Sequence, residues 1–448
     1  MKTNLLLSIL IISFAISTTG ISYSRETQKD FSPQPDEQQL PKAMHSKMKE
    51  LPYITAGQEN ADLKGNDNRI LQAAVDYIAG LGGGVVKIEA GEYLMYDSLH
   101  LHSNVTVRGS KGKTILRKAV CVVSTLALDG DFGEQQITLK EPKGFKVGCG
   151  VAIWDEGSGG FHTTVARITG RNNNTFSIDK PLMADCMVQR KATAASVFPV
   201  ISGYNIEEAR VENLIIDGNK NSNVHLNGCR GAGIFLYRAF GTVIKDCVVR
   251  NYNGDGISFQ QSNDVSVTGC ICENNSYLGI HPGSGSQRPH VSNSVARSNG
   301  TDGLFLCWRV RHGLFENNIM ESNGRFGISI GHKDSDNLIC RNIVRLNSRD
   351  GIFFRNETLG MAPHRNRLEN NIIENNGMQE NAAGIRIRGQ TNNLVFKNNI
   401  IHDTREDKLQ KQTIGILIEE QVGQITLKDN KIKAKTAVED RRKSKPKK

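Results

Sequence analysis

The repeat that decides the fold is clearest in residues 327–352, GISIGHKDSDNLICRNIVRLNSRDGI, which begin and end on the same Gly-Ile pair. A glycine followed by an aliphatic residue returns every 23 or 24 residues through the middle of the chain and at longer steps afterwards. The glycines that mark the repeat are Gly233, Gly256, Gly279, Gly303, Gly327, Gly351, Gly384 and Gly415. A fixed period of this length is typical of stacked supersecondary units.

A second set of positions keeps the same spacing and turns from small residues into asparagine. Four residues before successive anchor glycines the chain places Tyr252, Asn275, Asn299, Asn323 and Asn347, and nine residues before them Cys247, Cys270, Ser294, Asn318 and Asn342. Apolar residues alternate with period two, which indicates strands and turns. Three short strands per repeat predict an all-β parallel β-helix whose coils lie about 4.8 Å apart. Inward asparagines in one column can then bond from coil to coil.

The chain outside the repeats divides by composition. Residues 1–24 have a lysine, an apolar run and a small-residue site, which indicate a signal peptide and a secreted protein. The further segments are a linker (25–55), an N-terminal cap with the first coils (56–114), a β-rich insertion (115–200), the β-helix repeats (201–432) and a basic disordered tail (433–448). In the cap, Asn66 and Asp67 can begin a helix with one apolar face made of Ile70, Ala74, Tyr77 and Ile78.

The net charge of +10 does not predict a nucleic-acid partner, because the tail from residue 433 holds eight Lys or Arg and two acidic residues. We expect no membrane span after signal removal, and a monomer. The nine cysteines show no metal-binding spacing. Cys247 and Cys270 fall in neighbouring coils, where a disulfide is conceivable, but their Cβ vectors run parallel and favour free buried thiols.

Two stretches carry a resemblance to a known family. Asp62–Tyr93, with its Gly-Gly-Gly-Val-Val segment, looks like a capping helix and first strand, and the repeats follow from Gly231. Together they resemble the pectin lyase-like proteins, whose fold is a single-stranded right-handed parallel β-helix with an N-terminal capping helix. The resemblance implies action on carbohydrate, but the same coil carries lyases, hydrolases, epimerases and non-catalytic spikes.

The middle coils concentrate titratable and aromatic residues at positions that the alternation turns outward. They are His281, Trp308, Arg309, His332 and Lys333, and the glycines beside them, Gly283 and Gly331, predict room for a ligand. Arg309, Lys333 and Arg355 place cations on successive coils, about 4.8 Å apart. Such a row suits an acidic polysaccharide or oligosaccharide.

On a uronate polymer, β-elimination needs a cation against the carboxylate, a base for the C5 proton and an acid for the leaving oxygen. We assign His281 or His332 as base, Arg309 and Lys333 as carboxylate clamps, and Trp308 as a stacking platform. Arg355, Glu357 and Arg288 complete the predicted substrate-binding set. No cofactor is expected, since the aspartate cluster that binds calcium in pectate lyases of this fold is not recognisable.

Three alternatives stay open. The first is glycoside hydrolysis, which needs two carboxylates; Asn253-Gly254-Asp255-Gly256 resembles a polygalacturonase motif, but Asp255, Asp302 and Asp350 are interpreted as turn formers. The second is epimerisation: residues 279–283 resemble the Gly-Phe-Asp-Pro-His stretch of alginate epimerases, with His281 and Gly283 replacing its Asp and His. The third is a non-catalytic glycan-binding or adhesin-type protein.

Tyr277 is either an acid beside His281 or a packing residue.

Overall fold

The computed structural model describes residues 50–158, 160–379 and 382–443. The chain divides into two units, Met1–Glu50 and Leu51–Lys448, and every element below belongs to the second. The predicted signal peptide and most of the predicted linker lie outside the described residues. The last linker residues do not form a linker, because strand β1 (Tyr53–Gly57) pairs in parallel with β3 (Gly84–Ile88).

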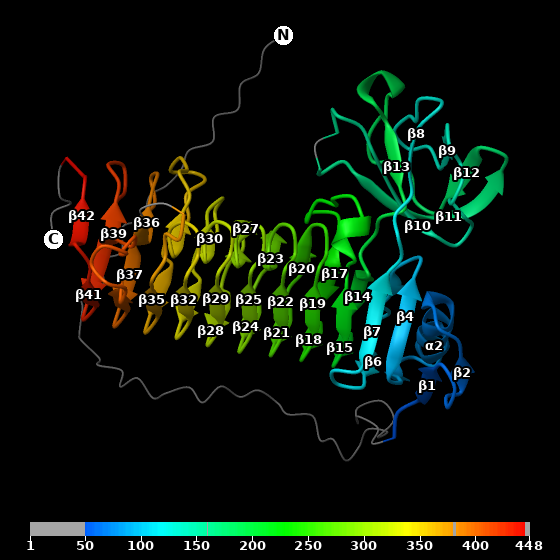
Figure 1. The fold of residues 1–448 in the computed structure, drawn as a ribbon, viewed down its shortest axis with the longest axis horizontal. Helices are drawn as coiled ribbons and strands as arrows, with labels where there is room; N and C mark the ends of the chain where they lie inside the picture. The colour runs from blue at the N-terminus through cyan, green and yellow to red at the C-terminus, as the bar shows by residue number, and fades with distance from the viewer. Residues whose placement is uncertain (1–49, 159, 380–381, 444–448) are drawn as a thin grey trace, which may run out of the picture. The chain divides into compact units, whose positions relative to one another are not determined.

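The described chain winds into stacked coils whose strands form three parallel sheets (Figure 1). The first sheet has, in order, β2 (Leu63–Lys64), β1, β3, β6 (Val105–Gly109), β15 (Arg210–Glu212), β18 (Val243–Lys245), β21 (Ser266–Thr268), β24 (His290–Ser292), β28 (Leu314–Glu316), β31 (Leu338–Cys340), β34 (Arg367–Glu369), β37 (Leu394–Lys397) and β40 (Ile425–Lys428). The second has β4 (Gly91–Met95), β7 (Thr114–Lys118), β16 (Ile215–Asp217), β19 (Val248–Arg250), β22 (Ile271–Glu273), β25 (Val295–Arg297), β29 (Ile319–Glu321), β32 (Ile343–Arg345), β35 (Ile372–Glu374), β38 (Ile400–His402) and β41 (Lys431–Lys433).

The third sheet carries the repeat that was read from the sequence. It has β42 (Thr436–Asp440), β39 (Ile414–Ile418), β36 (Ala383–Ile387), β33 (Ile352–Phe354), β30 (Ile328–Ile330), β26 (Leu304–Phe305), β23 (Ile280–Ser284), β20 (Asp255–Gln260), β17 (Ala232–Phe240), β14 (Ile201–Glu207) and β5 (Leu99–His100), with β27 (Cys307–Trp308) beside β23. The aliphatic residues after the anchor glycines stand in register; Ile257, Ile280 and Leu304 are three of them. All three are fully buried, which confirms the parallel β-helix.

Asparagine ladders run along the interior, as the sequence predicted. The Nδ2 of Asn299 donates to Oδ1 of Asn323 at 3.0 Å, and Asn323 donates in the same way to Asn347. A parallel ladder passes through Asn318 and Asn342. Each amide also donates to a backbone carbonyl of the preceding coil, so the buried polar groups of these corners are paired within the stack.

The insertion is an antiparallel sheet with a core of its own. Its strands are β8 (Val123–Thr125), β9 (Gln136–Thr138), β10 (Gly150–Trp154), β11 (Thr164–Asn172), β12 (Thr175–Ile178) and β13 (Thr193–Ala195). It starts slightly later than predicted, because β7 still belongs to a coil. The strands on either side of it pair directly: β5 with β14, β6 with β15 and β7 with β16. The coil stack therefore continues across the insertion.

Helix α2 (Asn68–Gly80) covers the first coils, and Asp67 caps it by accepting a hydrogen bond from the backbone N–H of Arg69. The predicted apolar face was partly wrong. Tyr77 is 56% exposed, whereas Leu71 and Val75 are fully buried, because the contact stripe is rotated from the predicted one.

The C-terminal region differs from the predicted disordered tail. Residues Thr436–Asp440 form β42 and pair in parallel with β39, since their alternating pattern lets them add a strand to the last coil. Residues 444–448 lie outside the described part.

All nine cysteines are free thiols, including the buried pair Cys247 and Cys270. In the part that is described, no helix has the length and apolar character needed to cross a bilayer.

Candidate functional site

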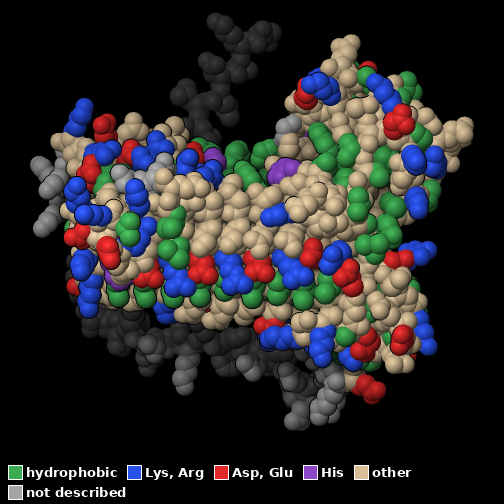
Figure 2. Space-filling view, viewed as in Figure 1, with side chains coloured by type: hydrophobic (Ala, Val, Ile, Leu, Met, Phe, Trp, Pro, Cys, Tyr) green, Lys and Arg blue, Asp and Glu red, His purple; other side chains and the backbone are tan. Residues whose placement is uncertain are grey.

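A cavity of about 520 Å³ lies on the outer face of the third sheet, where the insertion adjoins the coils. Figure 2 shows the molecule hollowed at this place. Strands β20, β23 and β27 supply its floor, and Phe161 and His162 of the insertion line its opposite side. The loop before β17 contributes Asn227, Gly228 and Cys229. Segments far apart in the sequence therefore form one cavity.

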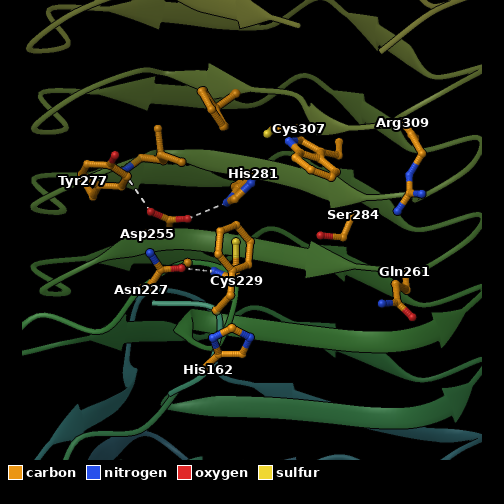
Figure 3. Close-up of a pocket in the computed structure, with 15 residues that line it drawn as sticks. His162, Asn227, Cys229, Asp255, Gln261, Tyr277, His281, Ser284, Cys307 and Arg309 are labelled. Atoms are coloured by element: carbon orange, nitrogen blue, oxygen red, sulfur yellow. Dashed lines mark hydrogen bonds and ion pairs between the residues drawn. The ribbon is translucent and has the colours of Figure 1, made fainter. Parts of the chain in front are cut away.

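A buried carboxylate–imidazole pair forms the wall of this cavity. Oδ2 of Asp255, on β20, lies 2.8 Å from Nδ1 of His281, on β23, and Figure 3 shows the two side chains facing each other. Asp255 is fully buried and His281 is 4% exposed. Oδ1 of Asp255 accepts a hydrogen bond from the backbone N–H of Leu278 at 3.2 Å. The second ring nitrogen, Nε2 of His281, has no hydrogen-bond partner among the described residues.

Gly228 allows the loop before β17 to lie against this carboxylate. A Cβ at position 228 would stand 1.7 Å from Oδ2 of Asp255, so any residue other than glycine would displace either the loop or the carboxylate. The loop is held by Ser258 of β20, whose hydroxyl donates to the carbonyl oxygen of Gly228 at 2.6 Å. The covering loop excludes water from Asp255 and shapes the cavity around His281.

The rim of the cavity carries larger and more exposed side chains. Trp308 is 43% exposed, and the guanidinium of Arg309, also exposed, lies 6.0 Å from its ring centre. Tyr277 is 39% exposed, and partial burial raises the pKa of its hydroxyl. Phe305 meets the ring of His281 edge-on, with centres 5.2 Å apart. The rim thus combines a cation, aromatic faces and a phenol.

A second constellation joins the same cavity through Cys307. Its Sγ lies 3.1 Å from Nδ1 of His332, whose Nε2 lies 3.0 Å from Oε1 of Glu357. The three residues come from successive coils of the stack. Burial raises the pKa of the Cys307 thiol, and it lowers the pKa of His332 to about 4 with a further contribution from the charge of Arg355.

Arg355 does not extend into the cavity as predicted. Its side chain is 13% exposed; its guanidinium pairs with Asp334 at 3.2 Å and donates to the hydroxyl of Ser329 at 2.9 Å. The space beside Gly331, predicted to be open, is filled by this guanidinium, since a Cβ there would meet Nε of Arg355 at 2.3 Å. Burial raises the pKa of Asp334 to about 7, although Arg355 acts in the opposite direction.

The predicted site residues are thus only partly brought together. His281, Trp308 and Arg309 line the cavity, and His332 and Glu357 reach it through Cys307. Lys333 and Arg288 are not among the lining residues; Arg288 is exposed and paired with Asp264. The predicted space at Gly283 is also occupied, by the carbonyl oxygen of Cys307 and the side chain of Gln260.

Sequence reasoning missed two side chains of this candidate site. Asp255 was interpreted as a turn former, but its carboxylate holds His281. The resemblance of residues 253–256 to a polygalacturonase motif was the available signal. Cys307 was given no role, although it lies one coil before His332 in the repeat, and this spacing was the available signal.

A family model described as "Periplasmic copper-binding protein (NosD)" matches residues 211–411, less than half of the chain. Among the described residues, no three His, Cys, Asp or Glu side chains come together in a group that could hold a metal ion. No curated protein matches the chain.

Solved structures match over most of the chain. The A-module of the mannuronan C-5 epimerase AlgE4 of Azotobacter vinelandii is 14% identical, with a TM-score of 0.55, covering 87% of this chain and 99% of that one. The polygalacturonase of Erwinia carotovora is 12% identical, with a TM-score of 0.55, covering 90% and 100%. A glycoside hydrolase is 9% identical, with a TM-score of 0.54, covering 84% and 96%. The chain therefore has the pectin lyase-like right-handed β-helix fold, which confirms the resemblance seen in the sequence.

Proposed function

We propose that this protein is a secreted carbohydrate-active enzyme that cleaves an acidic, uronate-containing polysaccharide by β-elimination in the cavity described above. The observation that carries the proposal is the Asp255–His281 pair, which leaves one imidazole nitrogen unpartnered at the cavity wall. The similar structures include an enzyme named for mannuronan and one named for polygalacturonate. The matching family model is described as periplasmic, which supports export.

His281 is the base in this proposal. Its Nδ1 lies against the carboxylate of Asp255, so the neutral ring carries its proton on Nδ1 and donates it to Asp255. The lone pair then lies on Nε2, which has no partner in the described part of the chain. A base that is oriented by a buried carboxylate, on a residue that lines a cavity, is an arrangement suited to proton abstraction from carbon.

The rim residues supply the other parts of the reaction. Arg309 is placed to neutralise the uronate carboxylate, which makes the proton on C5 easier to remove. The exposed ring of Trp308 offers a stacking surface for a sugar. Tyr277 lines the same cavity as a protonated phenol and is the candidate acid for the leaving oxygen. Lys333, Arg355 and Arg288 have no direct part in this scheme.

Elimination is favoured over hydrolysis by the carboxylates of the cavity. Hydrolysis of a glycoside uses two carboxyl groups on either side of the bond. Among the described residues that line the cavity, Asp255 is the only Asp or Glu, and its carboxylate is already bonded to His281. Hydrolysis, epimerisation and non-catalytic glycan binding are the alternative functions that the same experiment distinguishes.

The test is incubation of the purified protein with a panel of acidic and neutral polysaccharides. New ultraviolet absorbance from unsaturated uronate ends, on an acidic polymer alone, is the expected result. Reducing ends without that absorbance would replace the proposal with hydrolysis. Binding without either product would replace it with epimerisation, if the C5 configuration of the bound uronates changes, or otherwise with a glycan-binding function.

A further inference from the structure

We infer that Cys307, His332 and Glu357 form a second catalytic group at this cavity, one that cleaves small carboxylic esters by acyl transfer to the Cys307 sulfur. Sγ of Cys307 lies 3.1 Å from Nδ1 of His332, and Nε2 of His332 lies 3.0 Å from Oε1 of Glu357. A nucleophile within reach of a base that a third group orients is the common pattern of covalent acyl-transfer sites.

The distances suit this role. With the carboxylate oxygen of Glu357 3.0 Å from Nε2 of His332, the ring proton is favoured on that nitrogen, which leaves the lone pair of Nδ1 directed at the sulfur. The thiol of Cys307 then donates to Nδ1. Because the pKa of His332 is lowered to about 4, the ring is neutral near pH 7.

Neighbouring side chains pack against Cys307 and His332, and Cys307 is open toward the cavity. Behind Cys307, Arg355 is tied to Asp334 and lies over the ring of Phe305, with its guanidinium carbon 4.5 Å from the ring centre. The ring of Trp308 lies 5.4 Å from that of His332. On the other side, Cys307 lines the cavity together with Phe305. A small acyl group fits this apolar wall, while the alcohol portion of an ester can extend toward the rim.

The reaction balances without any cofactor. As the thiol passes its proton to Nδ1 of His332, the sulfur attacks the carbonyl carbon of the ester and forms a C–S bond. The C–O bond breaks, and the leaving alkoxide takes that proton from His332. Water then gives a proton to His332 while its oxygen attacks the thioester; the C–S bond breaks, the acid leaves, and the sulfur regains the proton. Burial keeps the resting thiol protonated, so His332 must act in the attack itself.

Esters on the hydroxyl groups of a polysaccharide are the substrate class that this position fits, because His281 and Cys307 line one cavity. The chemistry at Cys307 does not depend on the elimination proposed for His281. An ester probe that contains no sugar therefore tests the Cys307 chemistry separately. Lack of reaction with that probe would contradict the esterase inference, whereas lack of reaction on a uronate polymer would contradict the proposed elimination.

The probe is p-nitrophenyl acetate, applied to the whole mature protein. We expect release of p-nitrophenolate, and mass spectrometry of the quenched protein should find one acetyl group on the Cys307 peptide. Cys307→Ala and Cys307→Ser should lose the acetyl group, and the release rate should fall by about 100-fold or more. Cys149→Ala is the matched control, since Cys149 is a partly buried thiol that does not line the cavity, and it should react as the unaltered protein does.

Glu357→Gln tests the orienting contact separately from folding. It should leave one acetylation site per chain while lowering the acylation rate about 10- to 100-fold, since the amide no longer fixes the ring proton. Equal rates in the unaltered, Cys307→Ala and Cys149→Ala proteins, or acetylation only at another residue, would overturn the inference. An unchanged thermal transition in Cys307→Ser would show that a lost rate is not lost structure.

Discussion

Asp255 and Asp302 stand at the same point of the repeat, two coils apart, yet they have different chemistry. Both carboxylates are fully buried, and each bonds a basic side chain of the next coil: Asp255 bonds His281, and Asp302 bonds Arg325 through two contacts of 2.8 Å. Arginine keeps its charge at any ordinary pH, whereas an imidazole exchanges protons near neutrality. Only Asp255 lines the cavity beside the insertion. The repeat determines where an aspartate lies. Its chemistry depends on the basic side chain that it bonds and on the segments that pack over it.

Replacing His281, the partner of Asp255, should have the largest effect on turnover. His281→Gln removes the base and should lower turnover of a uronate polymer by about 100- to 10,000-fold. Initial rates of ultraviolet absorbance measure the loss. His290→Gln is the control, since His290 is a half-buried histidine paired with Glu316 and away from the cavity. Equal rates for the two variants would remove His281 from the mechanism.

Exchanging each aspartate for asparagine sharpens the same comparison. Asp255→Asn no longer fixes the proton of His281 on Nδ1, and turnover should fall by about 100-fold or more, with little change in folding. Asp302→Asn should leave turnover unchanged and lower the free energy of unfolding by about 1–3 kcal/mol, since Arg325 loses its charged partner. Rate assays and denaturant unfolding of both variants measure this. Equal effects of the two substitutions on turnover and on stability would mean that the two positions are equivalent.

The interior ladders should respond in stability alone. Asn323→Ala leaves the backbone N–H and the side-chain amide of Asn299 without their acceptor, at a cost of about 1–3 kcal/mol in the free energy of unfolding. Asn430→Ala, at the partly exposed end of a ladder, should cost less. Denaturant midpoints compare the two. Equal losses, or a loss of turnover in Asn323→Ala, would contradict the structural role.

The smallest expected effect is a dependence of stability on pH. Because the pKa of His332 is lowered to about 4 in the folded protein, the unfolded chain binds more protons between about pH 4 and 6.5. This histidine therefore makes the free energy of unfolding rise with pH over that window. Asp334, with a pKa of about 7, acts in the opposite sense, and Glu357, Arg355 and Cys307 also face this group.

Comparison of His332→Gln with the unaltered protein isolates that contribution. Thermal midpoints measured from pH 4 to 7 should rise less steeply with pH in the variant. Asp336→Asn is a matched control, because Asp336 pairs with Arg365 in an exposed contact outside the group. Parallel curves for His332→Gln and the unaltered protein would contradict the lowered pKa.

Most of the fold could be predicted because it depends on local periodicity. The Gly-aliphatic pairs fixed the register of the third sheet, and the asparagine columns predicted the ladders through Asn299 and Asn323. The exceptions depended on contacts with other elements. Tyr77 is exposed because the first coils meet a different stripe of α2, and residues Thr436–Asp440 are ordered because β39 offers a free edge.

The site could be predicted only in part, for a related reason. The alternation turned His281 and Trp308 away from the core, as they lie in the structure, because that depends on strand geometry alone. The partners of the outward side chains depend on what covers them. The loop with Gly228 encloses Asp255, and the buried carboxylate of Asp334 draws Arg355 away from the cavity. Neither contact has a signature in the spacing of the repeat.

The direct pairing of β7 with β16, on either side of the insertion, has a practical meaning for protein engineering. The chain leaves the solenoid after β7 and rejoins it at β14 without a break in the pairing of the coils. A different lobe grafted between β7 and β14 would therefore keep the coil strands and change only the side chains that face the cavity from the insertion.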